Sequence, residues 1–100
     1  MQINDELSAS AVVSTGSAGR YVKQLVAHLG HKAEVRSEPE GERLLFSTGS
    51  CLLVSGNDAV RLHATAGTLE DLQHVQNIVG GHLERFGHRD QLAVAWQHPS

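Results

Sequence analysis

Three tight turns follow one another in the middle of the sequence and restrict the fold more than any other feature. They lie at residues 39–42, 49–50 and 56–58. Connections this short join antiparallel neighbours, because a parallel crossover needs about a dozen residues or more. The turns therefore predict a run of four antiparallel strands. These strands are residues 33–38, 43–48, 51–55 and 59–65.

Two of these strands have informative patterns. Residues 51–55 are apolar on both faces, which predicts a central strand. In residues 59–65 apolar and polar side chains alternate, as expected for a strand with two different faces. A further strand is predicted in the second half of residues 8–15, where Val12 and Val13 are the only sizeable side chains.

Two amphipathic helices are predicted, one before and one after the four strands in the sequence. The first runs over residues 18–29, with Ser17 as its N-cap and Gly30 as the left-handed residue that ends it. Its apolar stripe consists of Ala18, Val22, Leu25, Val26 and Leu29.

The second helix begins after Thr68, a good N-cap residue, and ends near Gly87. Its apolar stripe consists of Leu72, Val75, Val79, Leu83 and Phe86. Gly80 and Gly81 lie inside this helix, which predicts either a kink or the close approach of another segment. Leu92, Val94 and Trp96 then alternate in a tail that forms either a short strand or an apolar flap.

The element order is thus strand, helix, four strands, helix. It predicts a single α+β domain over residues 1–100, with a loose leader at 1–8 and a tail at 97–100. Two helices are expected on one face of an antiparallel sheet. This order is similar to TATA-binding-protein-like or helix-grip architectures, without any implication of DNA binding.

Charge and cysteine content exclude several classes of protein. The net charge is −3 and the basic residues are interleaved with acidic ones, which argues against nucleic-acid or membrane-surface binding. A single cysteine, Cys51, cannot form an internal disulfide. No signal peptide or membrane span is recognisable, so a cytoplasmic location is expected.

Three segments together resemble a bacterial family catalogued as domain of unknown function 2218 (DUF2218). They are residues 20–32, the region around Phe46 and Gly49, and residues 82–86 with Arg89, Leu92 and Trp96. The resemblance spans about residues 11–96 and brings no assigned activity with it. Some relatives look like companions of siderophore-interacting, flavin-dependent ferric reductases, which implies an iron or siderophore context and such a reductase as a partner.

The seven histidines are the main candidates for a site. His28 and His82 are expected at the edges of the two helix stripes, where they could face each other beside Tyr21. With His31, or alternatively His63 or Glu84, they could hold zinc or iron, although no H-E-x-x-H motif is present and no cofactor is otherwise predicted. The alternative is a half-buried histidine bonded to a backbone carbonyl or to Tyr21.

A second candidate is the loop at residues 14–20. Its hydroxyls and glycines, a helix N-terminus and Arg20 could hold a phosphate or carboxylate, with Ser17 contributing. The alternative is a capped turn with a surface arginine. Cys51 is expected to be a buried, inert thiol because its neighbours are apolar.

No catalytic residue is predicted. The leading hypothesis is a small non-catalytic binding or accessory domain with Tyr21, His28, His82, Arg20 and Ser17 as ligand-binding residues. One alternative is a metal-binding protein or metal-dependent enzyme that uses His28, His31 and His82. Another is a self-associating domain that forms a homodimer through its sheet face or the Trp96 tail.

Overall fold

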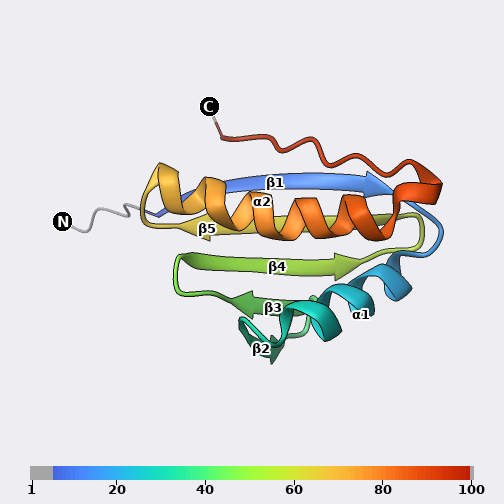
Figure 1. The fold of residues 1–100 in the computed structure, drawn as a ribbon, viewed down its shortest axis with the longest axis horizontal. Helices are drawn as coiled ribbons and strands as arrows, with labels where there is room; N and C mark the ends of the chain where they lie inside the picture. Colours follow the sequence, from blue (N-terminus) through green and yellow to red (C-terminus); the bar gives the residue numbers. More distant parts are fainter. Residues whose placement is uncertain (1–5, 100) are drawn as a thin grey trace.

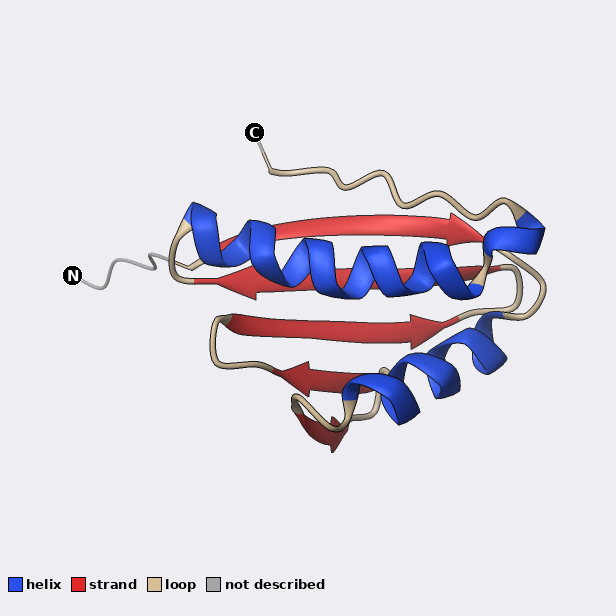
Figure 2. Ribbon diagram, viewed as in Figure 1, coloured by secondary structure: helices blue, strands red, loops and turns tan. Residues whose placement is uncertain are grey.

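The computed structural model describes residues 6–99 as one antiparallel sheet with two helices (Figure 1). The elements, in chain order, are β1 (Leu7–Ser14), α1 (Ala18–Leu29), β2 (Glu34–Ser37), β3 (Glu42–Leu45), β4 (Gly49–Ser55), β5 (Ala59–Ala66), α2 (Leu69–Phe86) and the short 3-10 helix η1 (His88–Asp90). This confirms the predicted α+β order of strand, helix, four strands, helix. Both helices lie on the same side of the sheet (Figure 2).

The strand order across the five-stranded sheet is β1-β5-β4-β3-β2. The apolar strand β4 is central, as predicted. Among the five strands of residues 6–99, β1 is hydrogen-bonded only to β5, and this pairing joins Leu7 to Ala66 and Ser14 to Ala59. The sheet therefore brings the first strand of the chain against the last.

The alternation of side chains decides which face of the sheet is covered. In β1, Ala9, Ala11 and Val13 point toward the helices and are buried. Leu53 and Leu62 do the same from β4 and β5, and both are almost fully buried. Burying one leucine side chain contributes roughly 1.5–3 kcal/mol, so these contacts between the sheet and the helices stabilise the fold strongly.

The two helices cover the sheet with the predicted stripes. Helix α1 packs on β3, β4 and β5, and helix α2 on β1, β4 and β5. The small side chains of Ala9, Ala11 and Ala64 lie in the buried core beneath them. In α1 the stripe also includes Tyr21, whereas Val26 is only half-buried.

Several strand boundaries differ from the prediction, among them the start of β1 and the turn between β3 and β4. Strand β1 begins at Leu7, so it extends into the segment predicted as a leader, whose residues 1–5 lie outside the described residues. The small residues Ser8, Ala9 and Ser10 have weak strand propensity, and it is their pairing with β5 that makes them a strand. Local sequence could not reveal this long-range contact.

The turn predicted at residues 49–50 is displaced. The chain turns at residues 46–48, where the Phe46 N–H donates to the Gly49 carbonyl at 2.7 Å. Gly49 and Ser50 instead belong to β4, where they face Ala66 and Thr65 of β5. Pairing with a full-length neighbour extends β4 beyond the apolar run that marked it in the sequence.

Both predicted ends of α1 are wrong in detail. The Ser17 side chain makes no capping bond, and the hydroxyl of Thr15 instead accepts a hydrogen bond from the Ser17 N–H at 3.1 Å. Gly30 is right-handed, with φ −61° and ψ −14°, because the helical turn continues through its N–H to the Val26 carbonyl. Thr68 does cap α2, by accepting from the Asp71 N–H at 3.1 Å.

The position of the tail explains why glycine is needed at Gly80 inside α2. The helix is continuous, and a Cβ on Gly80 would lie 2.9 Å from Nε1 of Trp96. Leu92, Val94 and Trp96 fold back onto the core, and one bridge joins Ser10 of β1 to Gln97. The tail is therefore an apolar flap, and Gly80 provides the space for its indole ring.

Among residues 6–99, neither helix has the length and apolar character needed to cross a membrane.

Candidate functional site

The two helices bring His28 and His82 together. The centroids of their rings are 5.0 Å apart, with an angle of 48° between the ring planes. Phe86, one turn after His82, contacts both rings with its edge or face, at 5.4 Å from His28 and 6.0 Å from His82. We call these three residues the histidine cluster.

Hydrogen bonding assigns the protons of His82. Its Nδ1 lies 2.7 Å from the backbone carbonyl of Ile78, one turn earlier in α2. A carbonyl oxygen can only accept a hydrogen bond, so Nδ1 carries a proton and donates it. In the neutral ring Nε2 then keeps a free lone pair. The predicted alternative of a histidine bonded to a backbone carbonyl is thus observed, and it leaves one nitrogen available.

An open groove of about 480 Å³ lies beside His28 and Phe86 of the cluster, and His82 is not among its lining residues. It is lined by Gln24, Ala27, His28, His31, Lys32 and Phe86. His31 therefore lies in the same groove as His28, although Gly30 separates them along the chain. Within residues 6–99, however, no three His, Cys, Asp or Glu side chains are close enough together to hold a metal ion.

Tyr21 does not join the histidines. Its side chain is buried, and its hydroxyl donates a hydrogen bond to Oδ2 of Asp90 at 2.6 Å. This bond to a carboxylate, together with burial and the nearby negative charge, raises the pKa of Tyr21 above its usual value of 10.0. Tyr21 therefore fastens α1 to η1, and the sequence analysis missed Asp90 because 69 positions separate the partners.

The predicted anion loop is only partly assembled. The guanidinium carbon of Arg20 lies 5.7 Å from the centroid of the Tyr21 ring, in a cation–π arrangement. Ser17 turns its N–H toward the Thr15 hydroxyl. In the described part of the chain, no hydrogen bond joins Ser17 to Arg20.

Cys51 is fully buried in the core. Burial raises the pKa of its thiol to about 12, because a thiolate there would lose its hydration. The thiol therefore stays protonated near neutral pH, in agreement with the predicted inert cysteine.

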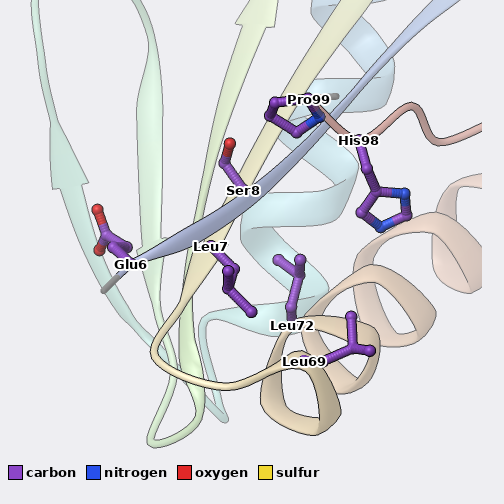
Figure 3. A pocket seen from close by; sticks show the side chains of 7 residues that line it. All are labelled: Glu6, Leu7, Ser8, Leu69, Leu72, His98 and Pro99. Carbon is purple, nitrogen blue, oxygen red and sulfur yellow. The ribbon is translucent and has the colours of Figure 1, made fainter. Parts of the chain in front are cut away.

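A second cavity lies between the start of β1, the first turns of α2 and the tail (Figure 3). It has a volume of about 380 Å³ and is lined by Glu6, Leu7, Ser8, Leu69, Leu72, His98 and Pro99. Leu69 is 55% exposed at its edge. The His98 ring is held in place by Nε2, which lies 3.2 Å from Oε1 of Gln76.

The face of the sheet that the helices leave uncovered is a third candidate surface. Strand register places Val12, Arg61 and Val54 in one row across β1, β5 and β4, and His63, Leu52 and Arg43 in the next row across β5, β4 and β3. We call these six residues the open sheet face. Val12 is 57% exposed, whereas Leu52 and Val54 are half-buried. The sequence analysis proposed the sheet face for self-association but named none of its residues.

Comparisons with known proteins give a consistent result. The sequence matches a family described as "Uncharacterized protein conserved in bacteria (DUF2218)" over residues 10–97. The structure is similar to the NMR structure of PA4090 from Pseudomonas aeruginosa, with a TM-score of 0.75 and 36% sequence identity. That similarity covers 91% of this chain and 95% of the other. No curated protein matches the sequence. The chain therefore belongs to the DUF2218 family of bacterial proteins.

Proposed function

We propose that this chain is a small, non-catalytic accessory domain that docks onto a larger protein through the open sheet face. The observation that carries the proposal is the mixture of side chains on this face. Aliphatic Val12, Leu52 and Val54 alternate with the basic residues Arg43, Arg61 and His63 on flat, hydrogen-bonded strands. Protein interfaces typically combine an apolar patch with arginine side chains.

The charges on this face favour an acidic partner surface. Arg43 is already paired with Glu38, at 2.6 and 3.1 Å. Arg61 is exposed, and among residues 6–99 it forms no ion pair. The guanidinium of such an arginine can form a bidentate pair with a carboxylate on a docking protein, because the two planar groups match in geometry.

The partner that we propose is a siderophore-interacting, flavin-dependent ferric reductase in the cytoplasm. Support comes from the resemblance to relatives that look like companions of such enzymes.

The test is to titrate the purified chain into the purified reductase of the same bacterium by isothermal calorimetry. We expect a complex of one chain with one reductase. Val12→Asp and Arg61→Glu should each weaken it about tenfold or more, since both lie on the open sheet face. Lys23→Glu is the matched control, because it reverses a charge on the exposed face of α1, away from the open sheet face. It should leave the affinity within about twofold.

Three results would contradict the proposal. One is that no complex forms, and another is a complex that Val12→Asp and Arg61→Glu leave unchanged. The third is a chain that is already a dimer by light scattering and is dissociated by Arg61→Glu. That outcome would make a second copy, rather than a reductase, the occupant of the open sheet face.

A further inference from the structure

We propose that His28 and His82 form a binding site for a divalent transition metal, with two imidazole ligands, beside the groove that His28 lines. The site lies between the helices, on the side of the sheet opposite the open sheet face. It is independent of the proposed docking function, so either can fail without the other.

The separation of the rings matches a shared metal ion. A zinc–nitrogen bond is about 2.0–2.1 Å, and the ligating nitrogen lies about 1.2 Å from the ring centroid. Two imidazoles on one ion, at bond angles of about 90–110°, therefore have centroids about 4.6–5.4 Å apart. The centroids of His28 and His82 are 5.0 Å apart before any ion is considered.

The proton on His82 is also placed as a metal ligand requires. Its Nδ1 donates to the Ile78 carbonyl at 2.7 Å, which orients the ring and leaves Nε2 as the ligating atom. Metal-binding histidines almost always donate their other ring N–H in this way. Phe86 contacts both rings in edge-on geometry, at centroid distances of 5.4 Å from His28 and 6.0 Å from His82.

The type and number of protein ligands determine which metal and which further ligands the site can bind. Imidazole nitrogens select zinc, copper or nickel over magnesium and calcium. With only two protein ligands, the ion must complete its coordination with water or with donor atoms of a bound molecule. Lys32 lines the same groove, so an anionic ligand would be favoured at those positions.

The experiment is a titration of the untagged chain with Cu²⁺ and, separately, with Zn²⁺. Electron paramagnetic resonance of the copper complex should show two nitrogen ligands at one equivalent. Histidine ¹⁵N NMR with zinc should shift the His28 and His82 signals first, among the seven histidines. His28→Gln and His82→Gln should each weaken the first equivalent about tenfold or more, because each removes the chelate.

His74→Gln is the matched control. This histidine lies on α2 as well, but its Nδ1 is 3.1 Å from the Thr48 hydroxyl and it is not part of the cluster. The control should bind metal like the unmodified chain. Equal weakening by all three substitutions, or first shifts at other histidines, would show adventitious surface binding and overturn the proposal. Far-UV circular dichroism verifies that each variant remains folded.

Discussion

At the scale of single residues, one hydrogen bond joins parts of the chain that the sheet does not connect. Tyr21 on α1 donates to Asp90 in η1, which follows α2 directly. The tyrosine ring is buried while Asp90 stays exposed, so the carboxylate keeps part of its hydration. The bond therefore fastens the end of α2 to the start of α1 at a small cost in desolvation.

This bond should make stability depend on pH in the alkaline range. Hydrogen bonding to Asp90 raises the pKa of Tyr21 in the folded state above the usual value of 10.0. The folded state therefore holds the proton more tightly, and the contribution is complete below about pH 10 and is lost as pH rises through the folded-state pKa. Urea unfolding of the unmodified chain and of Tyr21→Phe, at a series of pH values, measures the difference.

Below pH 10 we expect Tyr21→Phe to lower the free energy of unfolding by about 1 kcal/mol. The difference in unfolding free energy between the unmodified chain and Tyr21→Phe should decrease as pH rises further. Tyr21 is the only tyrosine, so tyrosinate absorbance follows this one group. A titration midpoint at or below the ordinary value would contradict the assigned role of Asp90.

At the scale of elements, the two glycines of α2 have different surroundings. A Cβ on Gly80 would meet the indole nitrogen of Trp96 at 2.9 Å, whereas a Cβ on Gly81 would meet nothing within 4 Å. Gly80 is thus required for packing, whereas Gly81 only lowers the helix propensity. Only the fold of the tail distinguishes the two positions.

Alanine substitutions should separate these effects. We expect Gly81→Ala to raise the free energy of unfolding by about 0.5–1 kcal/mol, because alanine favours the helix and the position is open. Gly80→Ala should instead displace Trp96 and shift its fluorescence to longer wavelength. Trp96 is the only tryptophan, so the signal is unambiguous. Equal fluorescence for the two variants would contradict the close packing of Gly80 and Trp96.

Much of the fold could be predicted at this scale because helix and strand periodicity are local. The stripe of α2 and the central place of β4 followed from pattern alone. The start of β1 did not, since Ser8 and Ala9 form a strand only through β5. Within the candidate site, the approach of His28 to His82 followed from the helix edges, whereas the partner of Tyr21 is 69 positions away and leaves no local trace.

At the scale of the whole molecule, the tail forms part of the core. Leu92, Val94 and Trp96 pack on buried residues, and the backbones of Ser10 and Gln97 exchange two hydrogen bonds at 2.9 and 2.8 Å. The tail therefore lies along the outer edge of β1, the edge that does not pair with β5 (Figure 1). Covered edges of this kind reduce pairing with other chains.

Removing the tail should weaken the domain without changing its fold. We expect a chain that ends at Asp90 to lose about 2–4 kcal/mol of unfolding free energy, from three half-buried apolar side chains. Exchange of the Ser10 amide hydrogen should become faster, because its acceptor on Gln97 is gone. A chain that ends at Gln97 is the control and should keep both properties. Unchanged Ser10 exchange in the shorter chain would contradict the bridge.

The pairing of β1 with β5 alone also sets the order in which the protein can be completed during synthesis. Residues 7–14 are made before residues 59–66, the strand with which they pair along their full length. Strands β2 to β4 can pair with near neighbours, while the first strand must wait. Contacts so distant along the chain slow folding, because a long loop has to close first. During synthesis, β1 can therefore join the sheet only after residues 59–66 have been made.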